Sequence, residues 1–132
     1  MSIFKDLTAF FEGPPLILPG LSLKSRDASV GAGLTYQPDL RQAVEHNITL
    51  TGATATIGNP ILGAMQKAGW ANILITHVRN ASGGAITITW GSAYRQAAFT
   101  DPADGDGVVT MWHFDVTNGL WYSSGRNTMA TA

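Results

Sequence analysis

Two stretches of the sequence decide the fold: NILITHVRNASGGAITITW at residues 72–90 and VVTMWHFDVTNGLWYSS at residues 108–124. In both, β-branched and aromatic residues alternate with polar ones, which is the period-two pattern of a strand with one buried face. Each stretch contains a turn, at Asn80–Gly84 and at Thr117–Gly119, where glycine supplies the positive φ that tight turns require. The two stretches therefore predict two antiparallel β-hairpins.

Alternation also assigns side chains to faces. It places Ile73, Ile75 and His77 on one face of the first strand and residues 74, 76 and 78 on the other, and both faces are partly apolar. Shorter strands are expected at residues 48–51 and 53–57, while residues 61–69 fit either a helical turn or a loop. Short strands with turns between them predict an all-β fold, a small antiparallel β-sandwich or jelly-roll-like domain.

Residues 1–35 have a different character. Apolar residues in Ser2–Phe11 have helical spacing and predict a short amphipathic N-terminal helix, which Pro14 and Pro15 end. Residues 16–23 then predict an extended arm, and Lys24–Gln37 a glycine-rich loop. The expected organisation is an arm region at 1–35, a β-sandwich domain at 36–126 and a tail at 127–132.

The arm contains many apolar residues and too little chain to form a core of its own, so it needs a surface to lie on. That surface is the rest of its own domain, a sister subunit or another partner. The candidate partner-binding residues of the arm are Ile3, Phe4, Leu7, Phe10, Phe11, Leu16, Ile17, Leu18, Leu21 and Leu23.

Composition narrows the classes of function. Charged residues make up 13% of the 132 residues, against about 25% in an ordinary soluble domain. Such a surface suggests cover by subunit partners. The net charge of −1 and the scattered lysines and arginines argue against nucleic-acid binding. No apolar run reaches the length of a signal peptide or a membrane span, which predicts synthesis in a cytoplasm without membrane insertion.

The sequence contains no strong motif for catalysis or metal binding. Cysteine is absent, and His46, His77 and His113 lack the spacing of a metal site, although a metal or catalytic role becomes stronger if the last two lie on neighbouring strands. The loop Asp101–Asp106 contains three carboxylates that suit calcium, but at the wrong spacing for an EF-hand. Neither a glycosidase carboxylate pair nor a serine nucleophile elbow is recognisable. We therefore expect no enzymatic activity and no cofactor.

The four tryptophans suit either of two roles, sugar binding or core packing. An exposed row of Trp70, Trp90, Trp112 and Trp121 would stack on sugar rings, whereas strand aromatics more often fill a core. A carbohydrate-binding module is therefore one alternative, and it requires at least two coplanar exposed aromatic side chains.

Four segments in order, NITLTG (47–52), TIGNP (56–60), SGGAITITWGS (82–92) and FDVTNGLWY (114–122), resemble a β-sandwich-like unit of tailed-bacteriophage virion proteins. The unit occurs in head decoration proteins, head fibres and tail fibres, and the likeness covers about residues 36–124. The loop after Trp90 departs from it, because AYRQAA replaces the usual Pro-Gly-Gly run.

The resemblance implies a virion structural protein, most specifically a capsid decoration or cement protein that stabilises the head. Its implied partners are other copies of itself, as a homotrimer, and the major capsid protein or another virion protein, contacted through the arm. A tail-fibre or baseplate component is the alternative within the same class.

Overall fold

The computed structural model describes residues 24–69 and 72–130, and its dominant element is the β-strand. In chain order the elements are β1 (Ser25–Val30), β2 (Leu34–Tyr36), β3 (Glu45–Leu50), β4 (Thr54–Ile57), α2 (Ala64–Lys67), β5 (Ile73–Asn80), β6 (Thr87–Trp90), β7 (Tyr94–Arg95), β8 (Gly107–Asp115) and β9 (Leu120–Met129). The all-β prediction is confirmed. The strands form a six-stranded sheet in the order β1-β3-β5-β8-β9-β7 and a three-stranded sheet in the order β2-β4-β6.

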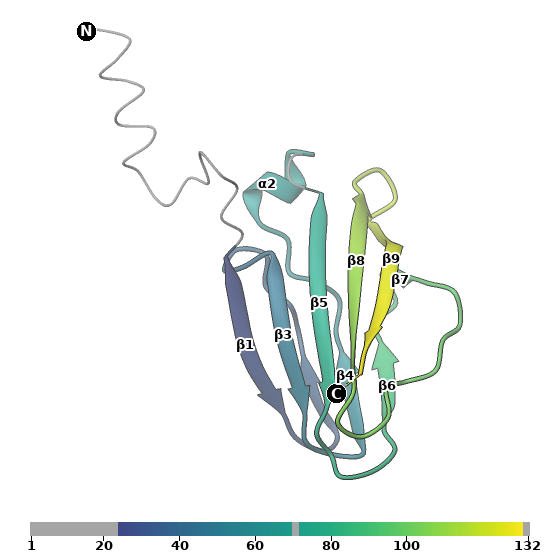
Figure 1. Cartoon of the computed structure of the whole chain (residues 1–132). Coiled ribbons are helices and arrows are strands. Elements are labelled where there is room, and N and C mark those ends of the chain that lie inside the picture. Colours follow the sequence, from purple (N-terminus) through teal and green to yellow (C-terminus); the bar gives the residue numbers. More distant parts are fainter. Residues whose placement is uncertain (1–23, 70–71, 131–132) are drawn as a thin grey trace, which may run out of the picture.

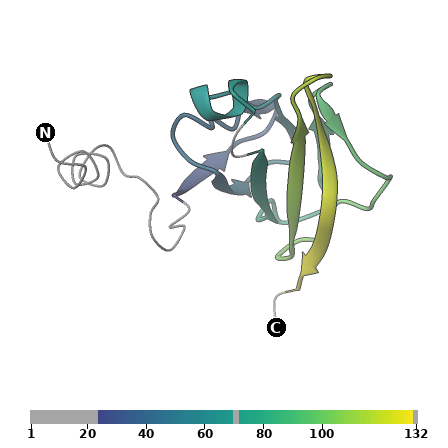
Figure 2. The ribbon, with the colours of Figure 1, turned by 90° about the horizontal axis from the view of Figure 1, so that it is seen from above.

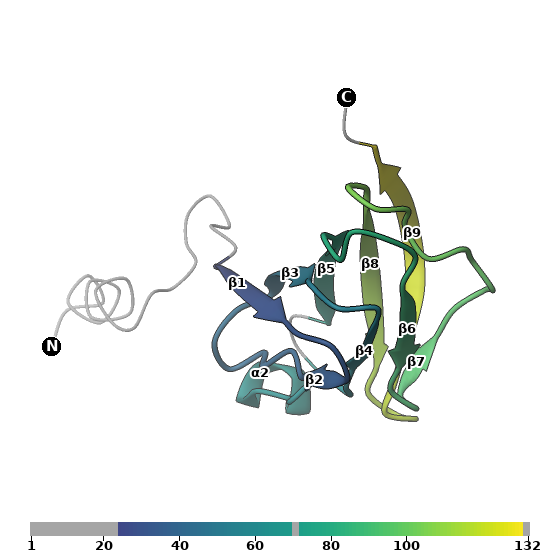
Figure 3. The ribbon, with the colours of Figure 1, turned by 90° about the horizontal axis from the view of Figure 1, so that it is seen from below.

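The first six strands form three stacked β-arches, in which the two strands joined by a turn belong to different sheets. β1, β3 and β5 pair in parallel in the larger sheet, and β2, β4 and β6 pair in parallel in the smaller one. Equivalent positions of successive arches therefore stack in columns, such as Val30, Leu50 and Asn80. Figures 1 and 3 show the smaller sheet lying behind the larger one as a second layer.

The turns of the arches stack as closely as the strands. The Thr51 amide donates to the Val30 carbonyl at 2.9 Å, which continues the hydrogen-bond ladder past the strand ends. A Cβ on Gly52 would lie 2.4 Å from backbone atoms of Ala32, closer than atoms approach. Glycine at this position therefore allows the second arch to pack on the first.

The remaining strands extend the larger sheet. β8 pairs antiparallel with β5, β9 pairs antiparallel with β8, and β7 pairs in parallel with β9. The tip of the β8–β9 hairpin is held by the Asp115 carboxylate, which accepts hydrogen bonds from the amides of Thr117 at 3.0 Å and Asn118 at 3.3 Å, while Gly119 has a φ of 69°. The hairpin predicted at Thr117–Gly119 is confirmed. Seen from above, the larger sheet twists between β1 and β9 (Figure 2).

One core fills the space between the two sheets. Ile48 and Leu74 enter it from the larger sheet and Ile57 from the smaller one. Trp112 and Trp121 are almost completely buried. The division of β5 into two faces is confirmed, and the structure shows that the face of Leu74 is buried while that of Ile73 points out.

A row of polar side chains crosses the inner side of the larger sheet. Thr76 and Thr110 are fully buried in it. The Thr76 hydroxyl accepts a hydrogen bond from the Trp112 indole at 3.0 Å, and the Thr110 hydroxyl accepts one from the Arg126 guanidinium at 3.1 Å. The same guanidinium stacks 3.5 Å from the centre of the Phe99 ring. Both buried threonine hydroxyls thus have the partner that burial requires.

The hairpin predicted at Asn80–Gly84 is wrong. β5 belongs to the larger sheet and β6 to the smaller one, so the turn between them joins two sheets and closes an arch. The prediction of an antiparallel arrangement is likewise wrong for the first six strands, which pair in parallel with one another. The loop predicted at Lys24–Gln37 is wrong as well, because this segment forms β1 and β2.

Both domain boundaries proposed from the sequence fall inside strands of the structure. Residue 36 is the last residue of β2, and both β1 and β2 pair with strands of the predicted domain. β9 continues to Met129, past residue 126. The predicted helix at Ser2–Phe11 and the arm at 16–23 lie outside the described residues.

Candidate functional site

The site is built on the outer face, the side of the six-stranded sheet that points away from the core. Strand register orders this face in rows. One row contains Ile73, His113 and Tyr122, and the next contains Glu45, Ile75, Met111 and Gly125. The third contains Asp27, Asn47, His77, Val109 and Asn127, and the fourth Thr49, Arg79, Gly107 and Met129. The first two rows are mainly apolar and the last two mainly polar.

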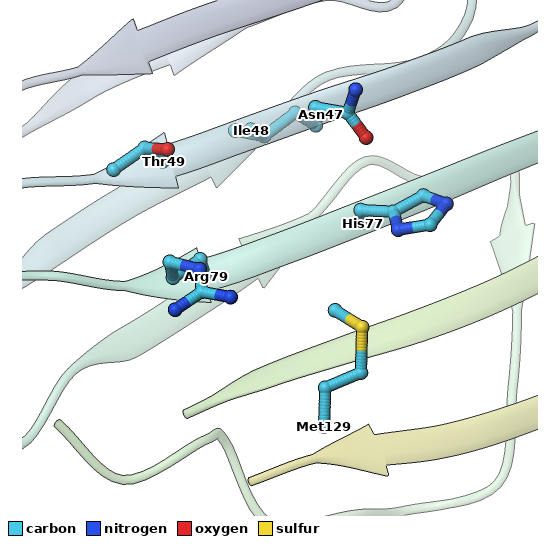
Figure 4. A pocket seen from close by; sticks show the side chains of 6 residues that line it. All are labelled: Asn47, Ile48, Thr49, His77, Arg79 and Met129. Atoms are coloured by element: carbon cyan, nitrogen blue, oxygen red, sulfur yellow. The ribbon is translucent and has the colours of Figure 1, made fainter. Parts of the chain in front are cut away.

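A pocket of about 250 Å³ opens in the polar half of the outer face. In Figure 4 the residues around the pocket come from β3, β5 and the end of β9, and the side chain of Ile48 points into the core. The residues that line it are Asn47, Ile48, Thr49, His77, Arg79 and Met129. We call this the polar pocket.

The walls of the polar pocket are fixed by hydrogen bonds and packing. The Asn47 amide donates to the Asp27 carboxylate at 2.8 Å, and His77 Nε2 lies 2.9 Å from a Glu45 carboxylate oxygen. Met129 crosses β8 over Gly107, where a Cβ would lie 3.1 Å from the Met129 methyl group. The absence of a side chain at residue 107 therefore lets β9 contribute to a pocket centred on β5.

Chemically, the polar pocket can bind a hydrogen-bonding group. Arg79 supplies guanidinium donors, one of which reaches the Gly105 carbonyl at 3.3 Å. The His77 and Glu45 side chains are each roughly three-tenths exposed, so the contact between them is open to water and contributes little to stability. Among residues 24–69 and 72–130, no three histidine, aspartate or glutamate side chains gather in a way that would hold a metal ion.

The other half of the outer face is an apolar patch, formed by Ile73, Ile75, Met111 and Tyr122. Three of these side chains are strongly exposed: Ile73 by 42%, Met111 by 45% and Tyr122 by 44%. Gly125 lies beside Met111 in the same row, and nothing is within 4 Å of the position a Cβ would take. The patch is therefore a group of apolar side chains around the exposed His113, which lies between Ile73 and Tyr122, with an open notch next to it at Gly125.

The sequence signal for this patch was the alternation in β5, which made both strand faces partly apolar. It did not reveal the notch, since a β-bulge between Met111 and Trp112 sets the register of Gly125 on β9. Nor did it reveal the polar pocket, which depends on bringing β3, β5 and β9 together.

The histidines considered from the sequence do not form a common site. β5 and β8 are neighbours, but His77 lies opposite Val109 and His113 opposite Ile73, four positions apart along the strands. His46 is fully buried on the inner side. Its Nε2 contacts the Ala43 carbonyl at 3.0 Å and its Nδ1 the Tyr36 hydroxyl at 2.6 Å, an arrangement that suits a neutral ring donating from Nε2.

Burial shifts the pKa values of His46 and Tyr36. It lowers the pKa of His46, because the charged imidazolium would lose its hydration, and it raises the pKa of the Tyr36 hydroxyl. Both groups are therefore neutral at pH 7 and belong to the folded framework.

The carboxylates of the Asp101–Asp106 loop serve as hydrogen-bond acceptors. Asp101 accepts from the Ile88 amide on β6 at 3.1 Å, and Asp104 accepts from the Gly83 amide at 2.9 Å. These bonds tie the loop to the smaller sheet and to the turn of the third arch, which is a structural use of the carboxylates.

The tryptophans within the described residues serve the core. Trp112 and Trp121 are 0% and 1% exposed, and Trp90 is half-buried against Tyr94 and Trp112. Trp70 lies outside the described residues. Tyr122 is the aromatic side chain with large exposure on the outer face.

Comparison of the chain with protein-family models, with curated proteins and with solved structures gave no match. In the described part of the chain, no helix has the length and apolar character needed to cross a bilayer. All ten candidate arm residues, from Ile3 to Leu23, fall outside the described residues.

Proposed function

We propose that this chain is a non-enzymatic structural protein of a bacteriophage virion, namely a capsid decoration protein. It binds the head lattice through the arm, residues 1–23, and associates with copies of itself as a homotrimer. In this proposal the stacked arches and the β8–β9 hairpin serve as the sandwich-like or jelly-roll-like unit of such proteins.

The observation that carries the proposal is the exposed apolar patch on the outer face. Ile73, Met111 and Tyr122 present apolar surface on a regular sheet, which is typical of a surface that binds protein. The low share of charged residues agrees with a chain that is covered in its working state.

The virion assignment rests on the sequence resemblance of residues 36–124. The residues that carry it serve construction in this chain: Gly119 closes the hairpin of β8 and β9, and Trp121 stacks on Phe114 with ring centres 4.6 Å apart.

Electron microscopy of purified virions that carry a tagged copy of the chain tests the location. We expect label on the head lattice. Label confined to the tail would overturn the decoration role in favour of a tail component, and unlabelled virions would overturn the virion assignment.

The role of the arm is tested by binding of purified variants to heads that lack the protein. Phe4→Ser with Phe11→Ser removes apolar side chains of the predicted helix and should abolish binding. Lys5→Ser with Glu12→Ser changes the polar side of the same segment and is the matched control. Equal binding by the two variants would contradict attachment through the apolar side of the arm.

A further inference from the structure

The apolar patch is too narrow for a broad partner. It occupies two rows over β5, β8 and β9, and the adjoining row contains Asn47 and His77. A second sheet packed face to face would also cover the polar rows that contain Asn47, His77 and Arg79, and these side chains would lose contact with water. A single extended segment that runs across the strands covers the patch, passes Glu45 at the edge of the same row, and leaves the rows of Asn47 and Arg79 in water.

The chain has such a segment next to the patch. The described residues begin at Lys24, and Ser25 lies in the same row as Glu45, Ile75 and Met111. The start of β1 is at the end of the sheet where β5 and β9 also begin (Figure 1). The preceding residues 16–23, LILPGLSL, are almost all apolar.

The reach of this segment matches the distance to the patch. Neighbouring strands lie about 4.8 Å apart, so the row from Ser25 to Met111 spans about 14 Å, and β9 is about 19 Å away. An extended chain advances about 3.4 Å per residue, which places Leu21 about 14 Å and Leu18 about 24 Å from Ser25. Leu21 thus reaches Met111, and Leu18 reaches the notch at Gly125 with length to spare.

The composition of the segment favours lying on the sheet over joining it as a strand. Pro19 has no amide hydrogen to donate to a neighbouring strand, and Pro15 precedes the segment. A tether of a few residues also holds the segment near the patch at an effective concentration in the millimolar range.

We infer that residues Leu16–Leu23 lie across the outer face of their own sheet and cover the apolar patch. This goes beyond the proposed function, because it divides the arm: the Leu16–Leu23 half anchors on its own domain, and the Ile3–Phe11 half is left for the partner. A patch covered by its own chain is not free for a partner, so the proposed function then rests on the Ile3–Phe11 half of the arm and on the sequence resemblance. The tests below use the isolated chain and do not depend on virion binding.

Alkylation of single cysteines tests the inference, since the natural chain contains no cysteine. Met111→Cys places a thiol in the patch, and Val116→Cys places one near the hairpin tip, where Val116 is 49% exposed. Leu18→Asp with Leu21→Asp in the Met111→Cys background should raise its alkylation rate about tenfold, the factor for a patch that is covered nine-tenths of the time. The Val116→Cys rate should not change with the same arm substitutions.

Equal rates at residue 111 with and without the arm substitutions would overturn the inference. So would protection of residue 111 that persists in the arm variant, because another occupant would then cover the patch. A change at residue 116 as large as that at residue 111 would show general loosening and would also count against it.

A disulfide assay shows whether the segment covers the patch of its own chain or the patch of a second copy. Leu21→Cys with Met111→Cys should oxidise within one chain and run as a monomer on a non-reducing gel, whereas Leu21→Cys with Val116→Cys should stay reduced. Disulfide-linked dimers at low protein concentration would overturn the assignment to the same chain and show exchange of the segment between copies.

Discussion

Asn80 is the residue on which the third arch depends. Its side chain is fully buried at the end of β5. The amide nitrogen donates to the carbonyls of Gly84 at 2.8 Å and Pro102 at 2.9 Å, and the amide oxygen accepts from the Ser82 amide at 3.0 Å and hydroxyl at 2.7 Å. The substitution Asn80→Asp keeps the shape of the side chain and replaces only the donor.

The cost of Asn80→Asp follows from these contacts. The buried Pro102 carbonyl loses its donor, which costs about 1–3 kcal/mol, while the Gly84 carbonyl is exposed and keeps the Ser82 hydroxyl at 3.0 Å. A carboxylate oxygen also faces those carbonyls in a buried site, which raises the pKa of the new aspartate. At pH 7 we expect the free energy of unfolding to fall by about 4 kcal/mol relative to the parent.

The loss should shrink in acid, opposite to the usual behaviour of an aspartate. A folded-state pKa raised above the unfolded value of about 3.9 means that the folded state binds more protons between the two values, so stability increases as pH falls through this window. A protonated carboxyl can also donate to one of the two carbonyls. Relative to the parent, the deficit should be about 2 kcal/mol smaller at pH 5 than at pH 7.

Urea denaturation of parent and variants at pH 5 and pH 7 measures this difference. Asn80→Ala serves as the control, because it loses the same donor without gaining a titrating group, so its deficit should not depend on pH. Ser82→Ala, which loses the hydroxyl contact alone, should cost about 1 kcal/mol and remain folded. An Asn80→Asp variant as stable as the parent, or one with the same deficit at both pH values, would refute the assigned orientation of the amide.

Three further measurements test other parts of the framework. Burial lowers the pKa of His46, so the parent should lose stability as pH falls below about 6.5, by up to about 1.4 kcal/mol per pH unit. Urea titrations measure this slope, and His46→Gln should remove it. Gly52→Ala forces a Cβ into neighbouring backbone and should cost about 2–3 kcal/mol in thermal unfolding, against about 0.5 kcal/mol for Gly84→Ala, whose Cβ meets nothing. Arg126→Met removes the hydrogen bond and the cation–π contact and should cost about 1–2 kcal/mol; an unchanged denaturation midpoint would contradict this contact.

The local pattern of the strands was predictable because it depends on neighbours along the chain. Alternation in β5 separated Leu74 and Val78 from Ile73 correctly, but it did not indicate which of the two faces is buried. The β8–β9 hairpin was predictable because Asp115 and Gly119 form its turn by contacts within the same segment.

The pairing of the strands was not predictable in the same way. Gly83 has a φ of 84° in a turn that joins two sheets, and a hairpin would use the same residue type. The difference lies in Asn80, whose donor reaches Pro102 in a loop distant in sequence. β1 and β2 were missed because polar residues and Gly31 and Gly33 resemble a linker, while parallel partners 20 or more residues away are invisible to a local pattern.

The candidate site was predictable from the sequence only in part. The apolar patch was partly visible as the second apolar face of β5. The polar pocket was not, since it needs the register that sets Met129 opposite Gly107 and Arg79 beside Thr49.

The stack of arches has two unlike ends. β8 continues the larger sheet beyond β5, and Asp101 covers the edge of β6. At the other end, within the described residues, β1 and β2 pair on one side only, and the charged Arg26 and Asp27 discourage pairing with another chain. Because each arch is held mainly by its neighbours, as in a repeat protein, local opening should spread inward from this end. Amide hydrogen exchange should therefore be fastest in β1 and β2 and slowest in β5, and uniform protection across the three arches would show that the stack opens only as a whole.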